Sequence, residues 1–253
     1  MVNIDIIRIV AQFTGDKQFL FFALVSRSWR EAWGRRLAVT SYITSYSTVP
    51  QLLFSFEFGL LRKSAALCVA IARAAKAGHL AVLRWAIENG CRWNSSTCTA
   101  AAEGGHLVVL QWARKNGCSW GSSTCSAAAA GGHLDVLQWA RANGCGWGSS
   151  TSFSAAGGGH LGVLQWARDH GCPWNAWTCC RAAGGGHMSV LQWARANNCP
   201  WNENTCAAAA KGGHLAALQW ARQNDCPWDE RTCTAAAEGG HLAILKWAKA
   251  NGC

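Results

Sequence analysis

A segment of 27 residues recurs along most of the chain, and this repetition restricts the possible folds more than any other feature. Each copy contains a variant of HLxVLQWAR that begins at a histidine. These histidines are His79, His106, His133, His160, His187, His214 and His241. One tryptophan follows each histidine by six residues, and a second keeps the same period in the next connector. Such self-similarity is typical of repeat architectures, in which each unit packs on its neighbours.

Each unit is expected to form two short helices. The first runs through TCxAAA, with Thr97 and its equivalents as N-caps, because a threonine hydroxyl can accept from an orphan backbone N–H. The Gly104–Gly105 pair ends it, since glycine adopts the left-handed conformation at little cost. The second helix begins near the histidine and ends before a further glycine. Both are too short to be stable alone, so the sequence predicts an all-α fold, an α-solenoid of helix-turn-helix repeats.

The repeat resembles the ankyrin repeat. The residues TCTAAAEGGHLAILKWAKANGC, which end the chain, are similar to the family pattern T-P-L-H-x-A-A…G-H-L-x-V-V-K-L-L-L…G-A. The resemblance covers residues 64–253 as seven repeats and implies a solenoid of ankyrin-like helix-turn-helix repeats whose first helices line a concave binding side. The repeat is shorter than the usual 33 residues. The shortening falls in the connector, so we expect most of the family's β-hairpin to be absent.

The segment before the repeats allows two interpretations. Residues 1–36 contain VSRSWREAW at positions 25–33, which resembles the end of an F-box, and residues 37–63 resemble a degenerate capping repeat. An F-box implies docking to the small adaptor of cullin-type ubiquitin ligases, and the alternative is a helical cap on the solenoid. The residues that the resemblance assigns to the adaptor are Ile6, Ile7, Ile9, Leu20, Leu24 and Val25.

Composition sets the expected location and charge preference. The chain has 23 Lys and Arg against 13 Asp and Glu, a net charge of +10 that favours acidic partners. No signal peptide or membrane-spanning run is evident, which predicts an intracellular protein, cytoplasmic or nuclear, without membrane contact. The 14 cysteines are then expected to be free thiols that pack as small apolar residues.

No catalytic, metal or cofactor site is predicted. Cys91, Cys98 and His106 recur as C-x6-C-x7-H, whereas structural zinc sites use closer pairs. Equal copies of the histidine indicate a structural role at a helix start, bonding the backbone of the next unit. The tryptophans share one helix face with leucine and alanine, which favours packing over base stacking.

A basic ridge occupies one position of the second helix in successive units. Stacked helices lie about 10 Å apart, so the charges would form a row. The ridge is either a solvated outer face or an electrostatic track for an acidic protein or a nucleic acid. Its members are Arg114, Arg141, Arg168, Arg195, Arg222 and Lys249.

Variation between units indicates a binding surface on the first helices. Packing positions repeat almost unchanged, whereas four residues of the third to fifth units depart from the pattern: Phe153, Trp177, Arg181 and Lys211. Aromatic side chains beside cations are typical of interaction surfaces. The sequence therefore predicts a non-enzymatic protein–protein interaction scaffold, either with or without a ubiquitin-ligase receptor role, and nucleic-acid binding is the alternative.

Overall fold

The computed structural model describes residues 65–88 and 90–253. The F-box-like segment 1–36 and the capping repeat 37–63 lie outside these residues, as do the predicted adaptor-docking residues Ile6, Ile7, Ile9, Leu20, Leu24 and Val25. The domain boundaries at 36 and 63 therefore stay predictions.

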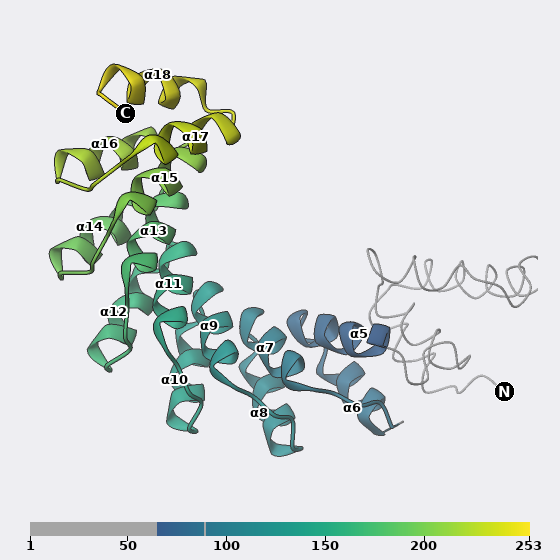
Figure 1. The fold of residues 1–253 in the computed structure, drawn as a ribbon. Coiled ribbons are helices and arrows are strands. Elements are labelled where there is room, and N and C mark those ends of the chain that lie inside the picture. The colour runs from purple at the N-terminus through teal and green to yellow at the C-terminus, as the bar shows by residue number, and fades with distance from the viewer. Residues whose placement is uncertain (1–64, 89) are drawn as a thin grey trace, which may run out of the picture. The chain divides into compact units, whose positions relative to one another are not determined.

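The described part consists of helices, arranged as successive pairs (Figure 1). No strand occurs in these residues, as the short connector predicted. None of their helices is long and apolar enough to cross a membrane. The first helices of the pairs are α5 (Ala65–Lys76), α7 (Ser95–Glu103), α9 (Ser122–Ala130), α11 (Ser149–Gly157), α13 (Ala176–Gly184), α15 (Glu203–Lys211) and α17 (Glu230–Glu238). The second helices are α6 (Leu80–Glu88), α8 (Leu107–Lys115), α10 (Leu134–Ala142), α12 (Leu161–Asp169), α14 (Met188–Ala196), α16 (Leu215–Gln223) and α18 (Leu242–Ala250).

The chain divides into two compact units. One contains the described residues 65–74 and 81–92, without residue 89, and the other contains residues 75–80 and 93–253. In the second unit each first helix packs on the next one, from α7 through α9, α11, α13 and α15 to α17 (Figure 1). Each second helix packs on the first helix of its own pair. This confirms the predicted fold class for the described residues, which form an α-solenoid of helix-turn-helix repeats.

The first helices from α7 to α17 begin two residues before the predicted threonines, and their N-caps lie three residues before them. Asn94 is the N-cap of α7, and its side chain accepts from the backbone N–H of Ser96. Asn175, Asn202 and Asp229 cap α13, α15 and α17 in the same way. The prediction that Thr97 is the N-cap is therefore wrong: its backbone N–H donates to the Asn94 carbonyl, and its side chain is buried in the first turn.

The core of the second unit is a ladder of identical small and apolar side chains. Leu110, Leu137, Leu164, Leu191 and Leu218 are fully buried, one from each successive second helix. Two alanines of each first helix from α7 to α17, such as Ala128 and Ala129 of α9, are likewise buried. Small side chains allow helices of only nine residues to approach closely, so each unit gains its stability from its neighbours.

The Gly-Gly-His motif joins consecutive units. Gly159 adopts φ +75°, and a Cβ atom there would lie 2.6 Å from the His187 ring of the next unit. The His187 Nε2–H donates to the Gly157 carbonyl at 3.0 Å, which fixes the ring on the glycine turn. His133, His160 and His241 make the same bond to the preceding unit. The predicted structural role is thus supported, but the histidine bonds the unit before it, not the unit after it.

Candidate functional site

An aromatic and cationic cluster lies on the exposed side of the first helices. Phe153 of α11 is half-buried, and the Cζ atom of Arg181 from α13 lies 5.9 Å from its ring centroid. Trp177, also on α13, is 53% exposed, which is unusual for a side chain of this size. Phe153, Trp177 and Arg181 are called the Phe153 cluster below.

Neighbouring units show that the positions of Phe153 and Trp177 face each other across successive first helices. Thr99 contacts Ser123 at 3.3 Å between their hydroxyl oxygens, and Ser126 donates to Ser150 at 2.9 Å, in each case across two successive first helices. Phe153 and Trp177 occupy the same two positions at the junction of α11 and α13. The structure therefore gathers three of the four predicted partner-binding residues at one junction.

Lys211 does not belong to this cluster. It is the last residue of α15, and its Nζ lies 3.0 Å from Glu238 Oε2 at the end of α17. Lys76 and Glu103 form the equivalent ion pair, at 2.7 Å, in earlier units. Lys211 therefore forms an exposed ion pair between two units, and such pairs contribute little to the free energy of unfolding.

The arginines of the basic ridge are engaged in intramolecular contacts. In each of units two to six the guanidinium donates to the carbonyl of the cysteine four residues later. Its Cζ lies 4.1–4.4 Å from the centroid of the tryptophan six residues later. Lys249 differs, because it is exposed and makes neither contact within the part of the chain that the structure describes. The ridge exists, but its arginines are half-buried clamps on the connectors.

The same connector tryptophans also contact the next unit. Trp120 packs edge-on against Trp139, with ring centroids 5.5 Å apart, and five further pairs repeat this contact at 5.2–5.9 Å. In units two to six each connector tryptophan therefore lies between a guanidinium of its own unit and an indole of the next unit, which agrees with the predicted packing role of the tryptophans. Sequence reasoning missed this ladder, although its signal was present: a tryptophan at fixed intervals of 6 and 25 residues after each arginine.

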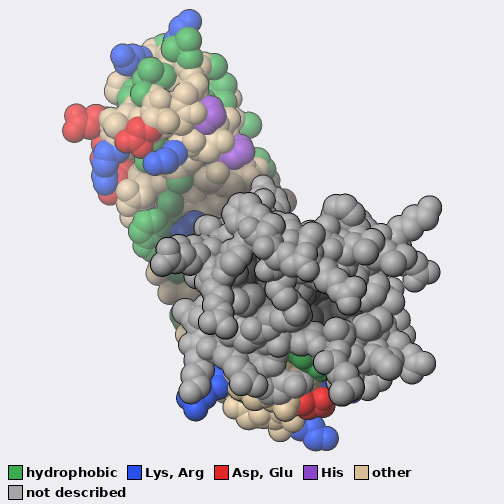
Figure 2. All heavy atoms as spheres, turned by 90° about the vertical axis from the view of Figure 1, so that its right-hand side faces the viewer, with side chains coloured by type: hydrophobic (Ala, Val, Ile, Leu, Met, Phe, Trp, Pro, Cys, Tyr) green, Lys and Arg blue, Asp and Glu red, His purple; other side chains and the backbone are tan. Residues whose placement is uncertain are grey.

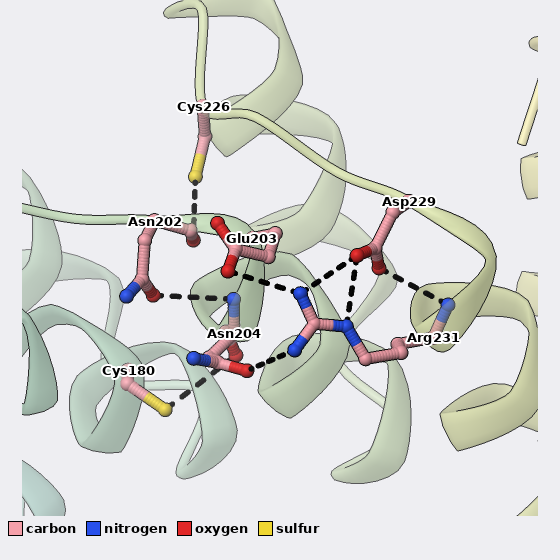
Figure 3. A network of polar contacts seen from close by, with 7 residues as sticks. All are labelled: Cys180, Asn202, Glu203, Asn204, Cys226, Asp229 and Arg231. Carbon is pink, nitrogen blue, oxygen red and sulfur yellow. Dashed lines mark hydrogen bonds and ion pairs between the residues drawn. The ribbon is translucent and has the colours of Figure 1, made fainter.

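A polar network joins α15 and α17 (Figure 3). The Arg231 guanidinium lies 2.9 Å from Glu203 Oε1 and 2.7 Å from Asp229 Oδ2, and it reaches Asn204 at 3.4 Å. The hydrogen bond from Arg231 lowers the pKa of the Asp229 carboxyl. Because one guanidinium faces two carboxylates, this network has a net charge of −1 and offers no excess positive charge to an acidic partner.

Charge on the C-terminal part of the array is mixed. Figure 2 shows acidic and basic side chains next to one another on the upper part of the face in view, which corresponds to the C-terminal helices of Figure 1. Residues 75–80 and 93–253 contain 12 of the 23 Lys and Arg residues and 8 of the 13 Asp and Glu residues. The array is therefore only weakly basic, since most of the excess positive charge lies elsewhere in the chain.

The described cysteines are free thiols, and eleven of the fourteen are buried. Burial raises the pKa of the Cys172 and Cys180 thiols, and it raises that of Cys91 to about 11. Within residues 65–88 and 90–253, no three His, Cys, Asp or Glu side chains lie so that they could share a metal ion.

The described residues form a solenoid of short helix-turn-helix repeats, and the Phe153 cluster interrupts the regular pattern of their first helices. No family model and no curated protein matches its sequence. Among solved structures, it is similar to the crystal structure of the human ASB11 ankyrin repeat domain, with a TM-score of 0.49 and 14% sequence identity. That likeness covers 65% of this chain and 85% of the other. The function is therefore argued from this chain's own residues.

Proposed function

We propose that this protein is a non-enzymatic scaffold that binds a partner protein through the exposed side of its first helices. The observation that carries the proposal is the 53% exposure of Trp177 at a position where the other first helices from α7 to α17 have serine, asparagine or arginine. A large aromatic side chain in water gains free energy when a partner covers it, so such residues often dominate an interface. Arg181, beside it, adds a guanidinium that can bind carboxylates in a fixed geometry.

The test compares two faces of the array. The full chain and two double variants would be used to capture partners from a cell extract, followed by mass spectrometry. The first variant, Trp177→Ala with Arg181→Ala, alters the Phe153 cluster, and the second, Gln165→Ala with Gln192→Ala, alters the second helices. We expect a set of proteins to be lost with the first variant only. Equal recovery with all three chains, or equal loss with both variants, would refute the proposal.

A ubiquitin-ligase receptor role is a finer proposal that rests on the F-box-like segment 1–36. Its support is the sequence VSRSWREAW and the apolar residues before it, all outside the described part. Co-purification of the cullin adaptor with the full chain, beside a chain that lacks residues 1–36, tests the role. Circular dichroism must show that the shortened chain still folds. Capture by the full chain alone supports the role, and equal results with both chains leave the segment as a cap.

Nucleic-acid binding is the second candidate function, favoured by the one-per-unit spacing of the basic ridge. The contacts of its arginines with carbonyls and tryptophans weaken this candidate, because the guanidiniums would have to serve a phosphate as well. Affinity for a single-stranded oligonucleotide, measured at rising salt, tests it. Binding through the ridge should weaken steeply with salt and fall in an Arg141→Ala, Arg168→Ala variant.

A further inference from the structure

Two helical glycines beside the Phe153 cluster have no structural explanation. Gly157 and Gly184 are the last residues of α11 and α13, where other units have Glu103, Ala130, Lys211 and Glu238. Neither glycine has a positive φ. A Cβ atom at Gly157 would contact only the Arg181 side chain, at 3.5 Å or more, and one at Gly184 would meet Ala208 at 3.4 Å. Both positions therefore accept a side chain.

Glycine at these positions lowers the stability of the helix, and no contact within the fold offsets this loss. A glycine within a helix costs about 0.5–1 kcal/mol relative to alanine, because it loses more backbone freedom on folding. Gly157 lies beneath the aliphatic part of Arg181, and Gly184 follows Arg181 by three residues in α13, so both glycines leave room around this cation that a larger residue would fill. A local rule broken without structural compensation points to a functional requirement, which here is the close approach of another chain.

The charge of this face indicates the chemistry of that chain. Arg181 is the only charged residue of α9, α11 and α13, and no ion pair joins it to another described residue. In contrast, Lys211 and Arg231 in the following units have carboxylate partners. The aliphatic part of Arg181 runs along Gly157, and its guanidinium extends toward Phe153. A cation held beside an aromatic ring and open to solvent suits a carboxylate.

We infer that the face formed by Phe153, Gly157, Trp177, Arg181 and Gly184 binds an extended protein segment with an acidic side chain. The segment passes close to Gly184 and to Arg181 where that side chain lies along Gly157, its carboxylate pairs with the Arg181 guanidinium, and an apolar neighbour covers Trp177. This inference rests on the proposed function and adds the partner's chemistry to it. It also explains why α11 and α13 differ from the other first helices at several positions at once.

The test uses a displayed library of random twelve-residue peptides, selected on the full chain. Selected peptides and versions with Asp and Glu replaced by Asn and Gln would then be titrated by fluorescence anisotropy. We expect the peptides to share an acidic residue. Affinity should fall about tenfold or more on neutralising that residue and in an Arg181→Ala variant, a change equal to one charge-assisted contact.

Matched variants separate binding from folding. Gly184→Glu introduces the residue that equivalent positions 103 and 238 already contain, so the fold should persist while its carboxylate repels the peptide. Gly184→Ala places a smaller side chain at the same position, and Gln192→Ala on α14 is the control that should bind as the unaltered chain does. Circular dichroism would confirm the fold of each variant.

The outcomes distinguish this inference from the proposed function. Peptides that depend on Trp177 but lack acidic residues, or that bind Arg181→Ala and Gly184→Glu unchanged, overturn the inference and leave the scaffold function intact. A library that yields no Trp177-dependent peptide contradicts both. Displacement of the peptides by a single-stranded oligonucleotide that itself requires Arg181 would show that the face binds phosphates, and this too would overturn the inference.

Discussion

Replacing Gly159 by alanine tests how consecutive units are joined. The residue has φ +75°, and a Cβ atom would lie 2.6–3.0 Å from three atoms of the His187 ring. The ring cannot move freely, because its Nε2–H donates to the Gly157 carbonyl. The left-handed conformation costs an alanine about 1–2 kcal/mol, and forcing a methyl group into a packed site costs about 1–3 kcal/mol. We therefore expect a loss of about 2–5 kcal/mol in the free energy of unfolding.

Three comparisons separate these contributions. Gly117 has φ +82° with nothing within 4 Å of a Cβ, so Gly117→Ala should cost only about 1–2 kcal/mol. Gly157→Ala, in the helix that ends before the same turn, should stabilise the protein by about 0.5–1 kcal/mol. A chain with both Gly159→Ala and His187→Ala has no ring to meet the added methyl group. Its loss should therefore be smaller than the sum of the two single losses.

Urea unfolding followed by far-UV circular dichroism at one temperature would measure all of these chains. The clash explanation requires Gly159→Ala to be clearly less stable than Gly117→Ala, and the difference to shrink without the His187 ring. If the two alanine variants are equally stable, or if removal of the ring leaves the cost unchanged, the imidazole does not determine this glycine. The junction between units would then need another explanation.

Three other perturbations address the core, the connectors and the thiols. Thr124 is fully buried, and its hydroxyl has no hydrogen-bond partner among the described residues. Thr124→Val should therefore raise the free energy of unfolding by up to about 1 kcal/mol. Thr99→Val should not raise it, because this change removes a hydrogen bond to the Ser95 carbonyl. Arg141→Lys should lose the stacking on Trp147 and lower the free energy of unfolding by about 1 kcal/mol. Urea unfolding followed by tryptophan fluorescence measures this loss. A loss no larger than that of Ala142→Lys would contradict the role of Arg141 in holding the connector. Burial raises the pKa of the Cys172 and Cys180 thiols above 9.0, so as pH rises the unfolded chain loses these protons before the folded chain does. The free energy of unfolding should therefore be unaffected below pH 9 and should fall above it, by up to about 1.4 kcal/mol per pH unit for each thiol. The fall should be smaller in Cys180→Ala.

The helix pairs could be predicted from the sequence because their limits are set by local signals. The histidine begins each second helix, and Gly104 and Gly105 end the first. Gly105 takes the left-handed φ of +75°, whereas Gly104 stays helical. Burial followed from the same periodicity, since the residues that repeat without change are those that contact the neighbouring units. Such local rules need no knowledge of the tertiary structure.

The N-caps and the arginine contacts could not be predicted in this way, because tertiary packing decides them. Asn94 and Thr97 are both good caps by type, and only the burial of Thr97 shows that the helix begins at the earlier residue. The regular spacing of the arginines predicted a row of charges. It did not show that the connector folds back to place Trp120 against Arg114, since this contact depends on the path of the connector.

Breaks in a perfect repeat fall into two kinds, and only one of them indicates function. Ser152 replaces a cysteine, but its buried hydroxyl donates to the Pro173 carbonyl at 2.8 Å, so the fold compensates for the change. Asn198, at φ 62°, replaces a glycine, and asparagine tolerates this conformation. Trp177, Arg181, Gly157 and Gly184 have no such compensation: an aromatic ring is exposed, a cation is unpaired and two helix positions lack side chains. These uncompensated breaks lie on two neighbouring first helices, α11 and α13, and the proposed partner would account for all of them together.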